Sequence, residues 1–573
     1  MRTDFSVGGM DTGSDELNST QWAAAISLFV VLMVPLAVML AWWCKQRYAR
    51  TVVALQRQSA AAAPIVEEAP SGAAPAPLTI DVVTVVNERA DLPAALAAAY
   101  RVRRRVLLSQ ALLGGVLWVL LLTTVAVALL VWSRATGQPD DASAASGLWT
   151  HLVLWPLLLA PPWLAWALQA GWRESHVWIA FGVGFAAIFI GSAGSGTGLL
   201  SSAVLVGLMA AMSALPLAFM RPAFRGAGPP LVLALSAGIA VFWILGAIGA
   251  ALDDSDADAP LTLADWWQFA WLALMFAVAG WCAWRLLLRL ARRYCEKRFS
   301  DVALAHSAYW SLIAAFTAST ALMLSYEERT GGAMQWVALS VFILWWSWRS
   351  VQRRVVAALA RSAPSRGPAL LLLRVFKPSA RSESFMDRLL ARWRFAGPAW
   401  LIAGPDLAGA FMEPDEFFVW LRRRLRECFI ACADEVPSRV DALDNARDPD
   451  GRFRVSELFC ADSTWKPAVL SLMDRADVVL LDLREFTPAR AGTHYELVQL
   501  LRRADLRKVR VLVGTGDAMA PLQAALQSAW REAQRAPENA SPAQARLQVL
   551  HLDERIDAQV RALATALAQA AQR

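Results

Sequence analysis

Charged residues are scarce in this sequence, and the scarcity is uneven. They account for 18% of the 573 residues, whereas a soluble globular protein carries roughly a quarter. Long apolar runs fill the chain up to about residue 348, and the mean hydropathy is +0.40. The residues beyond this point form an ordinary charged, amphipathic sequence. This contrast excludes a single soluble domain and indicates two regions in different solvents.

Signatures of metal binding and of several enzyme classes are absent. Cys428 and Cys432 lie four residues apart on a predicted helix, without the second Cys or His pair that a zinc site needs. No cysteine falls in a segment predicted to lie outside the cytoplasm or the membrane, so no disulfide framework is expected. The segment GTGDA at Gly514 lacks the Lys-Ser/Thr pair of a P-loop. The sequence therefore predicts no metal site, no cofactor and no P-loop hydrolysis of ATP or GTP.

Apolar segments long enough to cross a bilayer dominate the first part of the chain. A transmembrane helix needs about 20 largely apolar residues, and about nine segments qualify. They cover residues 22–43, 107–132, 148–170, 177–194, 199–220, 231–252, 266–284, 304–326 and 334–348. The sequence thus predicts an α-helical membrane bundle of about nine transmembrane helices.

The loops between these segments alternate in charge. The basic loops contain Lys45, Arg47, Arg50, Arg101, Arg103, Arg104, Arg105, Arg173, Arg221, Arg225, Arg285, Arg289, Arg292, Arg293, Lys297 and Arg298. The acidic loops contain Asp140, Asp141, Asp253, Asp254, Asp256, Asp258, Glu327 and Glu328. The positive-inside rule then predicts a bacterial inner-membrane protein with its N-terminus outside and its C-terminal domain in the cytoplasm. Because the arginines are placed where they fix the orientation of the protein in the membrane, the expected partner is the lipid bilayer and not nucleic acid.

Charged side chains are absent from the interior of the predicted spans. An ion pathway or a proton relay usually retains such residues within the membrane. A transporter or channel with an accessory cytoplasmic domain is therefore the alternative and not the first choice.

Small residues are expected at positions where helices pack closely. They are Gly182, Gly184, Gly238, Gly246, Gly249, Ser307, Ser311, Thr317, Ser319 and Thr320.

The predicted segments divide the chain into six parts. These are an extracytoplasmic tail (1–21), a first transmembrane helix (22–43), a cytoplasmic Ala/Pro-rich linker (44–105), an eight-helix transmembrane region (106–348), a basic juxtamembrane linker (349–367) and a cytoplasmic α/β domain (368–573). The alternating run LTIDVVTVV from Leu78 has the pattern of one additional strand within the linker.

Strand-like and helix-like patterns alternate in the last part of the chain. The strand-like runs begin at Leu370, Ala399, Asp477, Val509 and Leu547. The helical patterns cover residues 384–393, 414–431, 464–475, 493–503, 518–533 and 555–570. Strands that are apolar on both faces, each followed by an amphipathic helix, indicate a doubly wound, mostly parallel α/β sheet of flavodoxin-like type. Ligands of such sheets bind beyond the carboxyl ends of the strands.

Short motifs at those strand ends resemble a known group of enzymes. They read Ala403-Gly404-Pro405, Ala476-Asp477-Val478-Val479 and Gly492-Thr493-His494-Tyr495-Glu496. They are similar to motifs of the nucleoside 2-deoxyribosyltransferase-like group, which shares an open α/β architecture with TIR-type NAD-cleaving domains. The likeness covers about 100 residues, and it departs from the group at Ala491, where the group carries Asp. A longer pattern (GPDL, DPDGR, TW, DLR-F and G-x-x-x-E-L) also resembles a domain at the end of other bacterial multi-pass membrane proteins, and it implies no activity.

The resemblance implies that Glu496 is a nucleophile on a sugar carbon. A carboxylate there stabilises the positive charge that develops when an N-glycosidic bond breaks. Asp482 then orients a hydroxyl, while Arg484 holds a phosphate. The residues expected to bind the nucleotide-type ligand are Gly404, Pro405, Arg484, Gly492 and Thr493.

Simpler interpretations of the same residues stay open. Thr493 and Glu496 have the spacing of a capping box at a helix start, and Asp482 with Arg484 has that of a strand-end ion pair. Trp465 has the pattern of a hydrophobic anchor. The leading hypothesis is a membrane-anchored sensor or effector with a nucleotide-binding-like domain, which acts on N-glycosidic bonds of nucleosides or NAD if it is an enzyme. A transporter and a non-enzymatic membrane scaffold are the alternatives.

Overall fold

The computed structural model describes most of the chain after residue 38. The described residues are 39–55, 78–84, 93–135, 163–164, 166–167, 174–194, 199, 203, 206–207, 210, 214, 217, 226–252, 263–325, 333–362, 366–374, 380–403, 413–461, 463–484, 491–514, 519–533, 546–552 and 556–572.

The chain divides into two compact units. The helical unit comprises Met1–Lys45, Trp118–Ala283 and Ala305–Ile343. The α/β unit comprises Gln46–Leu117, Trp284–Leu304 and Leu344–Arg573. The α/β unit therefore contains three helix-bearing segments in addition to the domain that the sequence predicts for residues 368–573.

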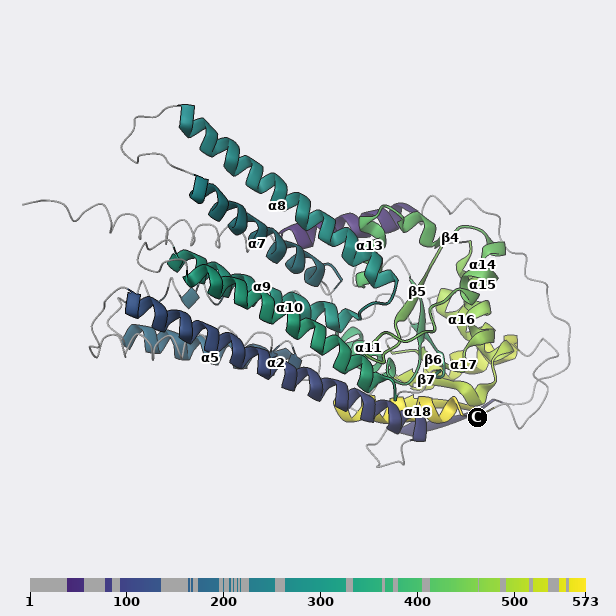
Figure 1. Ribbon diagram of the computed structural model, residues 1–573. Helices are drawn as coiled ribbons and strands as arrows, with labels where there is room; N and C mark the ends of the chain where they lie inside the picture. The colour runs from purple at the N-terminus through teal and green to yellow at the C-terminus, as the bar shows by residue number, and fades with distance from the viewer. Residues whose placement is uncertain are drawn as a thin grey trace, which may run out of the picture. The chain divides into compact units, whose positions relative to one another are not determined.

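The α/β unit is built on a sheet of eight parallel strands (Figure 1). The strands are β1 (Thr79–Thr84), β2 (Leu370–Arg374), β3 (Ala399–Ala403), β4 (Phe429–Ile430), β5 (Val455–Cys460), β6 (Val478–Asp482), β7 (Val509–Val513) and β8 (Arg546–His551). Their order across the sheet is β1-β8-β7-β6-β2-β3-β5-β4. The doubly wound parallel sheet that the sequence predicts is thus confirmed, although the membrane bundle is not.

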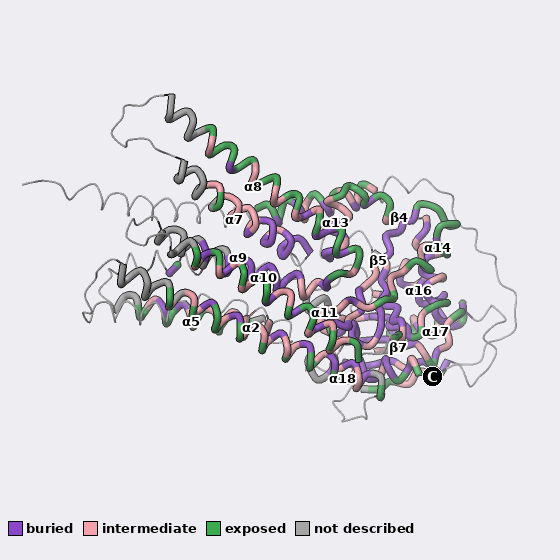
Figure 2. Tube along the Cα trace, viewed as in Figure 1, coloured by how far each residue is buried: buried purple, intermediate pink, exposed green. Residues whose placement is uncertain are grey.

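Helices cover both faces of this sheet, and two separate hydrophobic clusters result. On one face lie α14 (Val436–Asp441), α15 (Trp465–Arg475), α16 (Ala491–Arg503) and α17 (Met519–Ala533). On the other face lie α11 (Ala380–Trp393), α18 (Ile556–Ala570) and the first turns of α2 (Ala94–Ala135). In Figure 2 the buried colour runs through the sheet, while the covering helices carry exposed outer sides. Strands that are apolar on both faces, such as β2 and β7, bury one set of side chains in each cluster.

The strand predictions hold, including the one within the linker. All five predicted strands are present, and residues 79–84 form β1, which pairs with β8 in parallel over six residues. Two strands, β4 and β5, were not expected.

The predicted helix 414–431 is wrong beyond Leu421, because α13 (Pro414–Leu421) ends there. Arg423 adopts a positive φ of 60° and the chain then turns into β4, yet no Gly or Pro in the sequence marks this end.

Helices occupy the described parts of the predicted spans. They are residues 39–55, α2, α5 (Glu174–Gly194), α7 (Gly228–Leu252), α8 (Leu263–Cys295), α9 (Asp301–Ser325) and α10 (Ala333–Ala360). Within the described residues, two helices are long and apolar enough to cross a membrane, Leu96–Thr124 and Ala270–Cys295. The count of nine spans therefore stays a prediction.

Close helix packing in the helical unit is seen at two of the predicted small residues, Gly238 and Ser311. A Cβ added at Gly238 would lie 3.7 Å from the carbonyl oxygen of Ala279, which places α7 against α8. Nearby, the hydroxyl oxygens of Ser311 in α9 and Ser236 in α7 lie 3.2 Å apart. Gly182 does not share this role, because nothing lies within 4 Å of its Cβ position.

A fragment of residues 368–573, the domain that the sequence predicts, should be less stable than the complete α/β unit. It lacks β1, so β8 becomes an open sheet edge that can pair with other chains. We expect that joining residues 78–92 to its N-terminus through a flexible linker raises its thermal unfolding midpoint and lowers its aggregation. The same added residues in scrambled order are the control. Equal midpoints and equal aggregation for both joined fragments would contradict a role for β1.

Candidate functional site

The carboxyl edge of the sheet carries a topological switch point between β2 and β6. From β2 the chain adds β3, β5 and β4 on one side, and from β6 it adds β7 and β8 on the other. The last residues of the two central strands, Arg374 and Asp482, are register partners. Open α/β sheets bind ligands in the crevice at such a point. The topology therefore brings the predicted residues on β6 and at the start of α16 to the place where a ligand is expected.

Asp482 and Arg484 form a close ion pair at this edge. The Arg484 guanidinium donates from Nε to Oδ1 at 2.8 Å and from Nη2 to Oδ2 at 2.7 Å, and its backbone N–H donates to Oδ1 at 3.2 Å. The guanidinium carbon also lies 4.6 Å from the ring centre of Phe385. Both carboxylate oxygens of Asp482 are thus occupied, and the strand-end ion pair that the sequence left open is confirmed.

Thr493 and Glu496 are buried near the start of α16 but do not form a capping box. Thr493 is the third helical residue and not the residue before the helix, as a capping box requires. Thr493 is 0% exposed and Glu496 is 4% exposed. The Thr493 hydroxyl and Oε2 of Glu496 have no hydrogen-bond partner among the described residues. The capping-box interpretation is therefore wrong, and two buried polar groups remain that need a partner.

Burial raises the pKa of the Glu496 carboxyl to about 8. The side chain is then mostly protonated at neutral pH, and it can donate a hydrogen bond or a proton. A protonated carboxyl is a poor nucleophile, so the role that the resemblance implies does not fit this state. Chemically, the group resembles the buried acids that enzymes use as proton donors.

Two predicted residues of the site lie outside the described residues, Gly404 and Pro405, which follow β3. Gly492 is half-buried in the first turn of α16.

Trp465 is a hydrophobic anchor as expected, because it packs against the hydrophobic cluster on one face of the sheet, and its ring centre lies 5.3 Å from that of Tyr495 in an edge-to-face contact. Among the described residues no group of three or more His, Cys, Asp or Glu side chains is arranged to hold a metal ion.

A cluster of buried acids beside the switch point is not apparent from sequence patterns. Glu416 of α13 accepts a hydrogen bond from the Tyr48 hydroxyl at 2.9 Å. Burial, and then the neighbouring carboxylates, raise its pKa well above the usual range. Burial likewise raises the pKa of Glu457 on β5 to about 7, while the charge of Arg374 lowers it. The run EPDE at 413–416 reads as a helix start, so only the fold reveals that these groups are buried together.

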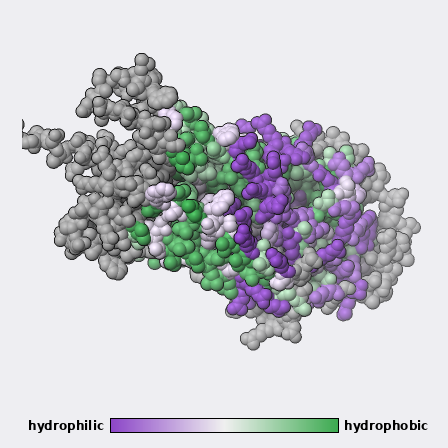
Figure 3. Space-filling view, viewed as in Figure 1, coloured by the Kyte–Doolittle hydropathy of each residue, from purple (hydrophilic) through white to green (hydrophobic). Residues whose placement is uncertain are grey.

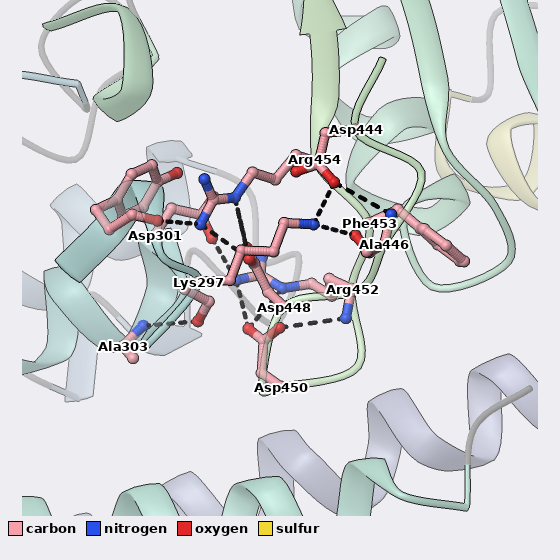
Figure 4. A network of polar contacts seen from close by, with 12 residues as sticks. Lys297, Asp301, Ala303, Asp444, Ala446, Asp448, Asp450, Arg452, Phe453 and Arg454 are labelled. Carbon is pink, nitrogen blue, oxygen red and sulfur yellow. Dashed lines mark hydrogen bonds and ion pairs between the residues drawn. The ribbon is translucent and has the colours of Figure 1, made fainter. Parts of the chain in front are cut away.

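A second group of charged residues, which no local sequence pattern predicts, centres on the segment DNARDPDGRFR at residues 444–454 (Figure 4). Asp301, at the start of α9, accepts hydrogen bonds from Arg394 at 2.9 Å and from Arg452 at 2.6 Å. Arg452 also pairs with Asp450 at 2.7 Å. Burial alone would raise the pKa of Asp301, but the two guanidinium groups outweigh it and lower that pKa.

The same segment holds the end of α8. Arg454 pairs with Asp448 at 2.9 Å and donates to the backbone oxygen of Tyr294 at 2.8 Å. Its guanidinium carbon lies 3.9 Å from the Tyr294 ring centre. Gly451 has a φ of +84°, and a Cβ there would lie 3.2 Å from the Ala360 side chain of α10. We call Asp301, Arg394, Asp448, Asp450, Arg452 and Arg454 the buried ion network, in which Asp301 and Arg452 are half-buried and the other four are buried.

Comparison with protein-family models, with curated proteins and with solved structures finds no match for this chain.

Glu496→Gln should remove a pH-dependent loss of stability. A raised folded pKa means that the group's contribution is fully present below its unfolded pKa of about 4.3. This contribution is lost as the pH rises through about 8. We expect similar thermal midpoints for both proteins at pH 5 and a higher midpoint for Glu496→Gln at pH 9, with Glu435→Gln (exposed) as control. An equal midpoint at both pH values would rule out a buried neutral acid.

Asp301→Asn should destabilise the α/β unit strongly. Removing one partner of a buried ion pair typically costs about 3–5 kcal/mol, because the remaining charge is left uncompensated. The Asp301 side chain is 18% exposed, so we expect a loss toward the lower end of this range. The lowered folded pKa of Asp301 means that its contribution is fully present above its unfolded pKa of about 3.9 and is lost progressively as the pH falls from there to the folded pKa. Glu296→Gln is the control, since its pair with Arg298 is 3.5 Å long and exposed. Thermal unfolding at pH 7 measures both, and equal losses would contradict the network.

Proposed function

We propose that this chain is a multi-pass inner-membrane protein whose α/β unit is a cytoplasmic sensor or effector domain for a nucleotide-type small molecule. One observation carries the proposal: Thr493 and Glu496 are buried polar groups without partners in the described structure, at the start of α16. Since α16 follows β6 in a parallel sheet, its N-terminal turns lie at the carboxyl edge, next to the β2–β6 switch point. Both groups are almost fully covered in this structure, so a ligand satisfies them only if the carboxyl edge opens to admit it.

Exposed apolar side chains on the helices support the membrane part of the proposal. Leu112 is 72% exposed, Ile190 is 70% exposed and Trp336 is 73% exposed. Figure 3 shows hydrophobic residues gathered over described helices on the visible face. Apolar surface of this kind is unfavourable in water and is typical of contact with lipid. With the alternating loop charges, it favours helices that span a bilayer.

Binding is better supported than cleavage at this edge. Asp482 has both carboxylate oxygens engaged by Arg484, so it is not available to orient a sugar hydroxyl in this arrangement. Arg484 is held in place at the end of β6, where a phosphate of a nucleotide is expected to dock. The same two bonds occupy Nε and Nη2 of Arg484, so a phosphate would meet a guanidinium that is already paired with Asp482.

A second candidate function is cleavage of an N-glycosidic bond with Glu496 as the proton donor. Its pKa of about 8 makes the carboxyl a competent acid at neutral pH. Protonation of the leaving base by Glu496 would replace the nucleophilic role that the resemblance implies. For the transporter alternative, the described part of helices α7 and α9 offers one polar contact, in which the buried hydroxyls of Ser236 and Ser311 lie 3.2 Å apart.

Thermal-shift measurements on the full chain in detergent test the proposed site. We expect nucleosides, nucleotides or NAD to raise the unfolding midpoint of the natural protein. Thr493→Val keeps the side-chain shape but removes the hydroxyl, and it should weaken that ligand by about ten-fold, the effect of losing one hydrogen bond to a buried group. Thr79→Val, exposed in β1, is the matched control. If none of these ligands stabilises the chain, or if Thr493→Val binds as tightly as the control, the proposed site is wrong.

A further inference from the structure

A basic cavity lies within the α/β unit, and none of the candidate site residues at the carboxyl edge of the sheet lines it. Its volume is about 410 Å³, and its walls come from α2, the α8–α9 connection, the second half of α10 and the DPDGR segment. Four arginines line it: Arg298, Arg353, Arg354 and Arg361. The one carboxylate in its wall, Asp450, is already paired with Arg452 at 2.7 Å. The cavity therefore carries a net positive charge.

The arginines are available to a ligand. Arg353, Arg354 and Arg361 make no ion pair among the described residues, and each is exposed. Arg298 has only a long, exposed contact of 3.5 Å with Glu296. Several like charges around one hollow repel one another, and an anion in the hollow relieves that repulsion.

Two buried amides in the same wall also need partners. Gln110 and Gln352 are each 3% exposed and both line the cavity. Oε1 of Gln110 and Nε2 of Gln352 have no hydrogen-bond partner within the described part of the chain. Buried polar atoms of this kind are normally satisfied by protein, water or ligand. The Gln352 amide can donate to an anion, and the Gln110 oxygen can accept from a hydroxyl.

We propose that this cavity binds a phosphate ester that carries a hydroxyl group, such as a glycerophosphate headgroup. Arginine guanidinium groups match phosphate oxygens, the Gln352 amide donates to the same group, and the Gln110 oxygen accepts from the hydroxyl. A lipid headgroup and a soluble phosphate compound share this chemistry. The cavity lies at the ends of predicted transmembrane helices 2, 7, 8 and 9, where basic pockets on the cytoplasmic side bind anionic lipids. The lipid source rests on the proposed membrane location, whereas the phosphate chemistry does not.

The lipid arm of the test uses the full chain in detergent, titrated with phosphatidylglycerol or with phosphatidylcholine. We expect saturable binding of phosphatidylglycerol, seen by native mass spectrometry and as a raised unfolding midpoint. Arg353→Gln with Arg354→Gln should weaken it at least ten-fold, as loss of charged hydrogen bonds implies. The matched control is Arg422→Gln with Arg426→Gln, which removes two exposed arginines outside the cavity.

The soluble arm uses glycerol 3-phosphate and inorganic phosphate with the same proteins. Saturable binding in either arm that is lost in the cavity double variant and kept in the control supports the proposal and identifies the source. Gln352→Leu provides a second variant, which should lose affinity without losing fold, since Leu fills a similar volume. The proposal is overturned if neither ligand binds or if the control loses affinity equally. Thr493→Val should leave this binding unchanged, so failure here is distinguishable from failure of the nucleotide site.

Discussion

The α/β unit depends on one largely covered carboxylate, that of Asp301, which two arginines share and whose side chain is 18% exposed. Asp301 starts α9, Arg394 follows α11, and Arg452 lies in the segment between β4 and β5, so three distant parts of the sequence meet at one charge. Neither arginine can be buried alone at acceptable cost, and the carboxylate is stable there only because both are present. The network thus fixes the α8–α9 connection and the DPDGR segment against the sheet. It also positions the wall of the basic cavity, because Asp450 pairs with Arg452 on one side and faces the cavity on the other.

Burial also decides the chemistry at the carboxyl edge. Glu496, Glu416 and Glu457 all have raised pKa values, and burial is the largest cause for each. Glu496 and Glu416 are therefore mostly neutral at pH 7 and can donate hydrogen bonds, whereas Glu457, with a pKa of about 7, is about half ionised. The cationic side chains at the edge are Arg374 and Arg484, the latter paired with Asp482. Such an arrangement suits an anionic ligand with polar groups, as a nucleotide is. It suits a carboxylate nucleophile poorly unless a bound cationic group lowers the pKa of Glu496.

The sequence predicted the parts of the fold that follow from local pattern. Five strands and the edge strand at Thr79 were found because apolar alternation and β-branched content are local properties. The end of α13 at Leu421 was missed because a non-glycine residue, Arg423, takes the positive φ that ends it. The Asp482–Arg484 pair was anticipated from two neighbouring residues. The contact of Asp301 with Arg452 spans 151 positions, and Tyr48 with Glu416 spans 368, so no local pattern could reveal either. Thr493 and Glu496 have the spacing of a capping box, and only the observed start of α16 shows that they are unpaired polar groups inside the helix.

Native-state hydrogen exchange on the full chain tests the central claim, that the buried ion network makes the α8–α9 connection part of the α/β unit. The informative amides are those of residues 296–304, residues 447–455 and strand β2. If the network joins them, all three groups exchange through a common opening and share similar protection. Fast exchange of residues 296–304 at the rate of an open loop, while β2 stays protected, would show that the connection is independent of the sheet and would contradict the account.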